Sequence, residues 1–566
     1  MTTPSLPDAE TDVLVVGSGA SGLAAALTAA ECGARVLVID SSHRFGGTSS
    51  TSGGVIWVPC NHLIAPAGGS DTEAEALRYL HELVGGDASE ARIQAFVRQA
   101  PRMFRFFNEQ CGIEFESLES YCDYHPELPG GKPGFRSCQA LSIKSNALGQ
   151  DAAILQEPHL GSTAFGRINF TAREAHTLVT QAKGAKWTFM KVLLKYVFDI
   201  GQRWKTSLDR RLTGGGALVA RLMQAARKRK VELRLSTALT DYLVENGRVV
   251  GAVVSTDGVS QRILAGRGVI VASGGFERNA RMRAQYMPQP TSTAWGAGVL
   301  TNTGEPILAA QRIGIAMGNM GSAWWAPAFK LSDEDRTRPL FVERALPGCI
   351  MVDEHARRFC NEAASYHVTG GIMAHGEGGE ARRAWLVFDK QFRGKYALGP
   401  LFPGPPKMDA WLPPSMRAIL EKADTVADLA RKMRVAPDAL EATISRFNEM
   451  AKAGKDLDYQ RGESLVDRYY SDAAVKPNPS LAPLAQAPYY ALPLFAGDIG
   501  TNGGILTDEH AQALTEGGAP MPGLYAVGNC SASVMGRSYP AAGGTLGPAM
   551  TFGYVAARHA LGMADG

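Results

Sequence analysis

The clearest pattern of apolar and polar positions in the chain lies within its first forty residues. The stretch "DVLVVG" is apolar from Val13 to Val16, which is typical of a short strand buried in a parallel sheet. The small residues of "SGLAAALTAAECG" predict a helix that stops at a glycine, and "ARVLVID" predicts a second strand ending at Asp40. This order of strand, helix and strand predicts a βαβ unit.

The rest of the chain contains further segments of strands and turns, interrupted by a long region rich in proline, tryptophan and amphipathic helices. Residues 72–110 predict helices, and residues 214–256 predict a helix, a strand and a hairpin that turns at "ENGR". "GVIVASGGFERN" predicts a buried strand followed by a glycine turn. Residues 302–496 shift toward proline, tryptophan and amphipathic helices, and strand and turn character resumes from residue 497, with a last short strand at "GLYAVGN". The pattern predicts an inserted second domain of residues 302–496, which divides the first domain into residues 1–301 and 497–566.

Composition narrows the class of protein without identifying it. A chain of 566 residues is too long to fold around one simple hydrophobic core. Its content of 45% hydrophobic and 20% charged residues is ordinary for a soluble protein. A formal net charge of +3 does not favour a nucleic-acid partner. The eight cysteines form no C-x-x-C pair or metal-type spacing, so we expect no metal site and reduced cytosolic thiols. Neither a signal peptide nor an apolar run of transmembrane length is expected, and we predict a cytoplasmic protein.

The turn after the first predicted strand carries the first candidate chemistry. Gly17, Gly19 and Gly22 form G-x-G-x-x-G between that strand and its helix, and Asp40 ends the following strand. In this setting the backbone N–H groups at the helix start bind a pyrophosphate, and the acidic residue accepts hydrogen bonds from a ribose. The alternative is a glycine-rich βαβ turn without a ligand. The sequence therefore predicts a dinucleotide cofactor.

The loop that follows separates FAD from NAD. "SSHRFGGTSSTSGGVIWVP" is rich in glycine, serine and threonine, which can follow the phosphates and ribityl chain of a flavin. It resembles the loop of FAD enzymes in the fumarate reductase and ketosteroid dehydrogenase superfamily, which implies an α/β fold with a Rossmann-like FAD-binding domain, an inserted α+β capping domain and non-covalent FAD. The predicted cofactor residues are Gly17, Gly19, Ala20, Ser21, Gly22, Asp40, Ser41, Gly46, Gly47, Thr48, Ser49, Ser52, Gly53, Gly54, Ala238, Ala272, Ser273, Gly274, Asn279, Gly528, Asn529, Gly544, Thr545 and Leu546.

A second site candidate lies close to the end of the sequence. In "SYPAAGGTLGPAMTFGYVAARHA", Tyr539 precedes two glycines and a helix that is predicted to begin near Leu546. The partial positive charge of that helix N-terminus suits a reduced, anionic flavin. A phenol beside a backbone N–H can form an oxyanion hole for a substrate carbonyl. Tyr539 as a purely structural residue of the turn is the alternative.

Four stretches together resemble the 3-ketosteroid Δ1-dehydrogenases of steroid and sterol breakdown. They are "RFGGTSSTSGGVIWVP", "ESYCDYHPELPGG", "MVDEHARRFCNEAASYH" and "GRSYPAAGGTLGPAMTFGYVAA", in the order of that family and across nearly the whole chain. One difference is Ala541, where relatives commonly have glycine, which we expect to be tolerated if its φ is negative.

The resemblance implies a reaction and roles for five residues. A flavin would oxidise ring A of a 3-oxo-4-ene steroid: a tyrosine removes a C2 proton, the C1 hydride passes to flavin N5, and an unidentified acceptor reoxidises the flavin. Tyr366 would be the base, while Tyr539 and the N–H of Gly543 would hold the C3 carbonyl. Tyr124 would support the base, with Tyr121 as the alternative.

Residues 183–212 resemble an insertion relative to shorter members of that family. Trp187, Met190, Leu194, Val197, Gly201 and Trp204 recur at helical spacing. Basic residues outnumber the acidic ones around them. A basic amphipathic helix with tryptophans suits the surface of a membrane, here its inner face. A helix packed on the protein with a solvated charged face is the other interpretation.

Two alternatives to a Δ1-dehydrogenase remain open from the sequence. The first is a related enzyme that would share the fold, either a fumarate-reductase-like reductase or a ketosteroid Δ4-dehydrogenase. His125, His367 and Arg537 keep the reductase open. The tryptophans of "SAWWAPAF", which we expect near the pocket, favour an apolar substrate instead. A flavin-binding regulatory protein without turnover is the third interpretation.

Overall fold

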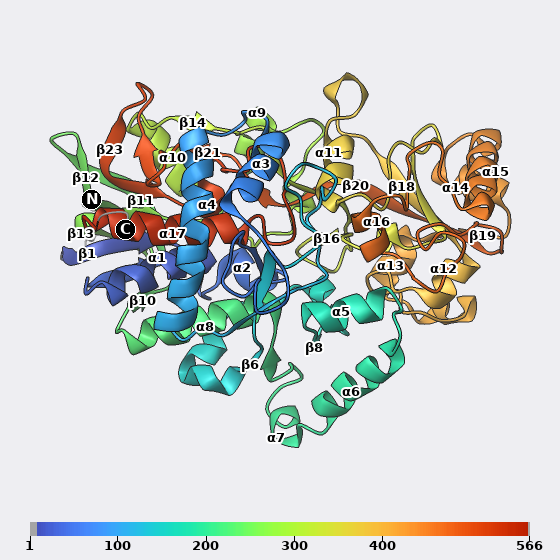
Figure 1. The fold of residues 1–566 in the computed structure, drawn as a ribbon, viewed down its shortest axis with the longest axis horizontal. Coiled ribbons are helices and arrows are strands. Elements are labelled where there is room, and N and C mark those ends of the chain that lie inside the picture. Colours follow the sequence, from blue (N-terminus) through green and yellow to red (C-terminus); the bar gives the residue numbers. More distant parts are fainter. Residues whose placement is uncertain (1–7, 564–566) are drawn as a thin grey trace.

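The computed structural model describes residues 8–563 and contains two large sheets, one in each half of the molecule (Figure 1). The first sheet has eight strands in the order β10-β2-β1-β13-β12-β11, with β23 beside β13 and β22 beside β23. Its strands are β1 (Ala9–Val16), β2 (Val36–Ile39), β10 (Glu232–Arg234), β11 (Thr237–Glu245), β12 (Arg248–Thr256), β13 (Val259–Val271), β22 (Gln512–Leu514) and β23 (Pro520–Ala526).

Strand β1 lies at the centre of this sheet, parallel to both β2 and β13. Its apolar run is buried on both faces: Val13 and Val15 belong to one hydrophobic cluster, and Leu14 and Val16 belong to the other. On the first face, helix α1 (Ala20–Glu31) packs against α8 (Gly214–Lys228) and α17 (Leu546–Ala560). The predicted βαβ unit and the predicted late helix are confirmed.

Two further predictions of local structure are confirmed. Residues 72–110 hold α3 (Glu73–Val84) and α4 (Glu90–Arg105), which continues into a π-helical turn (Phe106–Gln110). Strands β11 and β12 form an antiparallel hairpin in which Glu245 opposes Arg248, so the turn lies at the predicted "ENGR".

The second sheet forms the other half of the molecule. Its order is β16-β15-β20-β18-β17, with β19 also beside β20. The strands are β15 (Ala323–Phe329), β16 (Arg338–Pro339), β17 (Cys349–Asp353), β18 (Ala384–Asp389), β19 (Glu421–Ala423) and β20 (Tyr489–Thr501). The helices around it are α11 (Tyr366–Ala374), α12 (Lys390–Lys395), α13 (Pro414–Ile419), α14 (Val426–Met433), α15 (Pro437–Ala453) and α16 (Leu465–Tyr469).

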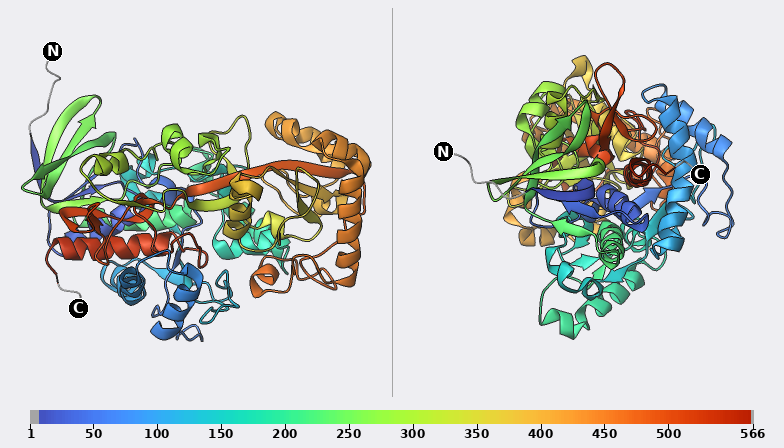
Figure 2. Two further views of the ribbon diagram at one scale, coloured as in Figure 1. Left: turned by 90° about the horizontal axis from the view of Figure 1, so that it is seen from above. Right: turned by 90° about the vertical axis from the view of Figure 1, so that its left-hand side faces the viewer.

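Strand β20 connects the two halves, as the long orange-red strand in the left view of Figure 2 shows. The predicted domain boundary between residues 496 and 497 therefore falls inside a continuous strand. An inserted domain of residues 302–496 stays a prediction, although the second sheet is built from residues 323–501.

Smaller elements complete the region between the halves. A three-stranded sheet has the order β3 (Val55–Trp57), β5 (Ser137–Ala140) and β4 (Phe115–Ser117). Helices α5 (Ala172–Val179), α6 (Ala185–Val197) and α7 (Ile200–Arg203) extend along the lower edge of the molecule in Figure 1. No helix within residues 8–563 has both the length and the apolar character that crossing a membrane requires.

Candidate active site

A large cavity lies between the two halves of the molecule. Its volume is about 1790 Å³. Ordinary sites for one small ligand occupy roughly 300–1,000 Å³, so this cavity has room for a cofactor and a substrate together. It extends from the carboxyl ends of β1 and β2 to a group of tyrosines that both halves contribute.

The glycine-rich turn after β1 forms one end of the cavity. Gly17 has a φ of +112°, and a Cβ on it would lie 2.3 Å from the carbonyl oxygen of Ala272. A Cβ on Gly22 would lie 1.9 Å from the oxygen of Gly17. Only glycine fits at these two positions, because β1, α1 and β13 meet there backbone to backbone.

Asp40 lines the same end of the cavity, directly after β2. The backbone N–H groups of Ser18 and Ser42 donate to its two carboxylate oxygens at 2.8 and 2.9 Å. Burial raises the pKa of this carboxyl, and the hydrogen bonds from Ser18 and Ser42 oppose that effect. Oδ2 also accepts from Ser18 Oγ, so Oδ1 keeps the second lone pair that can accept a hydrogen bond from a ribose hydroxyl.

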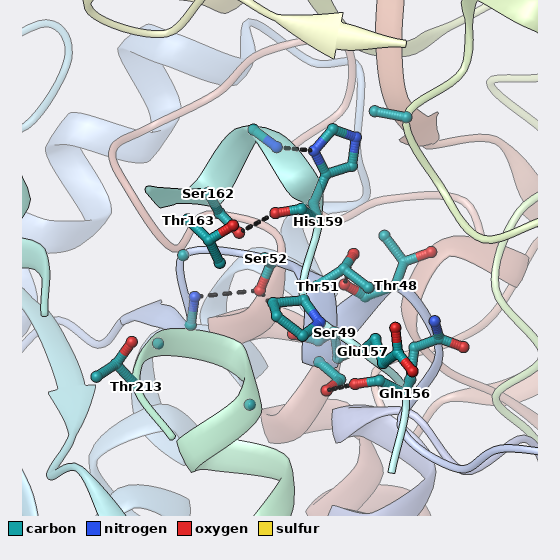
Figure 3. A pocket seen from close by; sticks show the side chains of 18 of the residues that line it. Thr48, Ser49, Thr51, Ser52, Gln156, Glu157, His159, Ser162, Thr163 and Thr213 are labelled. Carbon is teal, nitrogen blue, oxygen red and sulfur yellow. Dashed lines mark hydrogen bonds between the residues drawn. The ribbon is translucent and has the colours of Figure 1, made fainter. Parts of the chain in front are cut away.

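The loop after Asp40 extends along the cavity wall. It contains the short helix α2 (Gly47–Thr51), and Figure 3 shows its hydroxyl side chains Thr48, Ser49, Thr51 and Ser52 together with the chain from Gln156 to Thr163. Ser49 Oγ accepts a hydrogen bond from the N–H of Ala20 at 3.0 Å, which joins the loop to the start of α1. This wall of glycines and hydroxyl groups fits an extended diphosphate cofactor.

Most of the predicted cofactor residues meet at this cavity. Those that line it are Gly17, Gly19, Ser21, Asp40, Ser41, Gly47, Thr48, Ser49, Ser52, Gly53, Gly54, Ala238, Ala272, Ser273, Gly274, Gly528, Asn529, Thr545 and Leu546.

Five predicted cofactor residues lie outside the cavity lining: Ala20, Gly22, Gly46, Asn279 and Gly544. Asn279 caps α9 (Ala280–Tyr286): its side chain accepts from the N–H of Met282 and donates to the oxygen of Thr303, and its contact with the cofactor stays a prediction. Ala20 and Gly22 shape the first turn of α1, and Gly46 packs against Ser50 and Val219. Gly544 lines a separate small cavity.

Three tyrosines from distant parts of the chain meet at the other end of the main cavity. Tyr124 follows β4, Tyr366 begins α11 and Tyr539 precedes α17. Their ring centroids are 5.6–5.7 Å apart in each pair. The carbonyl oxygen of Pro540 accepts hydrogen bonds from the N–H of Tyr124 and the hydroxyl of Tyr79, which fixes Tyr124 beside Tyr539.

Tyr121 also lines the cavity, and its hydroxyl lies 3.5 Å from that of Tyr124. Its hydroxyl forms a short hydrogen bond with Tyr470, and its ring stacks on Tyr469. Sequence reasoning missed Tyr469 and Tyr470, which both line the cavity. The adjacent tyrosines of "DRYY" were the only available signal, and no spacing connects them to the other motifs.

Burial controls the protonation of this cluster. It raises the pKa of Tyr124, Tyr366 and Tyr539, and it raises the pKa of Tyr121 to about 12. The neighbouring phenol of Tyr539 raises the pKa of Tyr366 further, and a hydrogen bond with Tyr124 lowers it by less. The phenols are therefore neutral at pH 7, which suits donation of a hydrogen bond, whereas a tyrosine acting as base must first lose its proton.

Gly543 brings a backbone N–H to the same end of the cavity. Its φ is +92°, and a Cβ would lie 2.5 Å from the backbone of Ile56 and Trp57. Its carbonyl oxygen accepts from the N–H of Trp57, while no group within residues 8–563 accepts from its own N–H. That N–H and the hydroxyl of Tyr539, which accepts from Thr545 Oγ1 at 3.1 Å, provide two donors for a carbonyl oxygen. Ala541 is buried and its φ is not positive, so it fits the turn without strain.

His125, His367 and Arg537, which from the sequence kept a fumarate-reductase-like function open, do not line this cavity. His367 is buried and donates from Nε2 to the oxygen of Arg537, and burial lowers its pKa to about 4, so it is neutral. The Arg537 guanidinium is exposed and pairs with Asp87. Trp324 and Trp325 are also outside the main cavity, although Trp324 packs edge-on against Tyr539.

Helices α6 and α7 present an apolar surface to solvent. Trp187, Phe198 and Trp204 are 71%, 70% and 87% exposed. Met190, Leu194, Val197 and Ile200 are also exposed. Only Ala185 and Val192 of α6 are buried. We call these seven exposed residues the α6–α7 surface.

Comparison with known proteins places the chain among flavoproteins. The FAD binding domain family matches residues 12–546. A 3-oxosteroid 1-dehydrogenase of Mycobacterium tuberculosis is 40% identical over 97% of this chain and 98% of its own length. A 4-oxocyclohexanecarboxylate 2-dehydrogenase of Sinomonas cyclohexanicum is 35% identical over 99% of this chain and 94% of its own.

A solved structure resembles the whole molecule. It is the 3-ketosteroid Δ1-dehydrogenase of Sterolibacterium denitrificans in complex with 1,4-androstadiene-3,17-dione. The TM-score is 0.94 at 41% identity, covering 98% of this chain and 99% of the other.

Proposed function

This chain belongs to the FAD-binding family of the 3-oxosteroid 1-dehydrogenases, and we propose that it introduces the C1–C2 double bond into ring A of 3-oxosteroids. The observation that carries the proposal is one cavity with a diphosphate-type glycine turn at one end and Tyr124, Tyr366, Tyr539 and the free N–H of Gly543 at the other. FAD, when bound, supplies the two-electron acceptor that takes the C1 hydride.

The protein residues would act on the proton and the carbonyl of the substrate. The Tyr539 hydroxyl and the Gly543 N–H hold the C3 carbonyl oxygen, and this makes the C2 proton more acidic as negative charge develops on that oxygen. Tyr366 takes the C2 proton. Tyr124 adjoins Tyr366 at 5.7 Å between ring centroids and connects through Tyr121 to Tyr470, so a chain of phenols can pass the proton onward.

The test is anaerobic mixing of the purified yellow protein with androst-4-ene-3,17-dione or cholest-4-en-3-one. We expect the visible flavin band to bleach in proportion to the 1,4-dien-3-one formed. Comparing the two steroids identifies the preferred side chain. Bleaching by neither would refute the proposal, and a colourless protein would refute the cofactor assignment.

A carboxylated cyclohexanone is the second candidate substrate, because the relative from Sinomonas cyclohexanicum carries such a name. A substrate carboxylate requires a cation nearby. Within residues 8–563, the lysines and arginines lining the cavity are Arg44, Arg167, Lys186, Lys205 and Arg338, and none of them contacts the rings or hydroxyls of Tyr124, Tyr366 and Tyr539. The tyrosine end therefore favours an apolar ring system. Bleaching by 4-oxocyclohexanecarboxylate but by neither steroid would reverse this assignment.

We also propose that the α6–α7 surface docks on an anionic membrane. The same segment carries five exposed lysines, and no carboxylate within residues 8–563 pairs with them: Lys183, Lys186, Lys191, Lys195 and Lys205. Exposed tryptophans with unpaired lysines match the apolar and charged layers of a lipid interface. Met190 is part of this surface and also lines the cavity, so a sterol could enter directly from lipid.

Flotation with vesicles tests this contact. The holoprotein should float with vesicles containing phosphatidylglycerol and less with pure phosphatidylcholine. The double variant Trp187→Ala/Trp204→Ala should remain in the soluble fraction. Trp411→Ala is the matched control, since Trp411 is 78% exposed on the second half of the molecule. A wild-type protein that never floats would refute the docking proposal and leave the dehydrogenase proposal intact.

A further inference from the structure

A buried carboxyl group lies directly behind the cavity wall, in the turn between β13 and α9. Glu277 is 0% exposed. Its Oε1 accepts a hydrogen bond from Asn302 Nδ2 at 2.6 Å, and its Oε2 has no hydrogen-bond partner within residues 8–563. Added Cβ atoms on Gly275 and Gly298 would lie 2.6 and 2.0 Å from these oxygens, so two glycines make room for the carboxyl.

Asn302 connects this carboxyl to the cavity. Its amide nitrogen donates to Glu277 and also to Thr48 Oγ1, at 3.1 Å. The same Oγ1 accepts from the N–H of Val299. Asn302, Thr48 and Val299 all line the cavity, and Thr48 belongs to the predicted FAD loop. One side chain therefore separates Glu277 from the cofactor wall.

The charges around Glu277 leave it without an ion pair of its own. Asp498 on β20 is paired with Arg283 of α9 at 2.7 Å, and both side chains are at most 1% exposed. Arg278 donates to the carbonyl oxygens of Thr293 and Gly298. Burial and the charge of Asp498 raise the pKa of Glu277 to about 7, while Asn302 and Arg278 act in the opposite direction. The pKa of Glu277 therefore lies near neutral pH, above that of an exposed carboxyl.

We propose that Glu277 is a positioning residue that takes up a solvent proton when the bound FAD is reduced. The inference rests on the FAD assignment of the proposed function. A hydride brings two electrons and one proton, so reduction adds one negative charge beside the wall that Asn302 and Thr48 form. An O–H bond then forms on Glu277 with a proton from solvent, and that proton leaves when the external acceptor removes the electrons. Proton uptake offsets the added charge in a region of low dielectric constant.

The pH dependence of the FAD midpoint potential tests the proposal. The holoenzyme is reduced chemically with dithionite and redox dyes, without steroid, so failure of steroid turnover does not affect the result. A tenfold change in proton concentration shifts a two-electron couple by about 30 mV per coupled proton. We expect about 30 mV per pH unit below pH 7, where Glu277 is protonated in both states. Above that pH we expect about 60 mV, where reduction draws in a second proton.

The pH range in which the slope of the midpoint potential becomes steeper identifies the group that takes up the proton. Protonation of the flavin itself would steepen the slope at low pH, whereas uptake by Glu277 steepens it above neutrality. Glu277→Gln should hold about 30 mV per pH unit throughout, and Glu277→Asp should restore the steeper limb. A single slope of about 30 mV in the wild type would overturn the proposal without any variant. So would a steeper limb that persists in Glu277→Gln.

Discussion

Removing the hydroxyl of Tyr539 should slow the reaction strongly while lowering the stability of the protein only slightly. The side chain is 4% exposed, and its ring packs against Tyr124 and Trp324, contacts that Tyr539→Phe keeps. The lost hydrogen bond with Thr545 Oγ1 should lower the free energy of unfolding by only about 1 kcal/mol. In the proposed mechanism, Tyr539→Phe removes one of two donors to the developing oxyanion, while the Gly543 N–H remains. A single donor of this kind is worth ~2.7–4 kcal/mol in the transition state, or ~10²–10³ in rate.

The assay is anaerobic stopped-flow bleaching of the flavin band by a saturating 3-oxo-4-ene steroid, which isolates ring oxidation from the external acceptor. Tyr490→Phe is the matched control, since Tyr490 is fully buried on β20 and its hydroxyl donates one hydrogen bond to Asp409 at 2.9 Å. The control should bleach at the wild-type rate. A Tyr539→Phe rate within about threefold of wild type would refute the oxyanion role, given the ~10²-fold minimum expected. An equal loss in both variants would refute it as well.

Three further predictions concern the base and the cofactor. Tyr366→Phe should slow bleaching by about 10²–10⁴-fold, while steroid binding still perturbs the flavin spectrum, which a binding titration would record. Because burial raises the pKa of Tyr366, its ionised form is scarce at neutral pH, and the bleaching rate should rise about tenfold per pH unit from pH 6 to 9; a level pH–rate profile would assign the base to another group. Gly22→Ala should lose FAD, measured as the ratio of visible to ultraviolet absorbance, because its Cβ meets the Gly17 oxygen at 1.9 Å. Gly266→Ala, whose Cβ meets nothing within 4 Å, should retain the cofactor.

Local patterns in the sequence determined the cofactor end of the site. The apolar strand, the glycines and Asp40 lie within forty residues of each other, so their spacing alone specifies a βαβ turn with a free helix N-terminus. The 41–54 loop was predictable for the same reason, since its glycines and hydroxyls are consecutive in the chain. For Asn279 the sequence left two roles open, because an asparagine before a helix also fits an N-cap, and in the structure its side chain caps α9.

The substrate end depended on more than local pattern. Tyr124, Tyr366 and Tyr539 were identified through family resemblance, because the intervals between them exceed 150 residues and carry no periodic signal. Tyr469 and Tyr470 had no motif and emerged only when α16 was placed beside Tyr121.

The sequence by itself determined the βαβ turn, the 41–54 loop and the helix after Tyr539, since each follows from short-range geometry of the backbone. Only the tertiary structure decided that Gly543 must be glycine because the backbone of Ile56 and Trp57 lies against it. The same holds for the setting of Glu277, which needs Asn302 and Asp498 brought together from three segments. Burial sets the protonation of the tyrosines and of Glu277, and burial is a property of the packed chain.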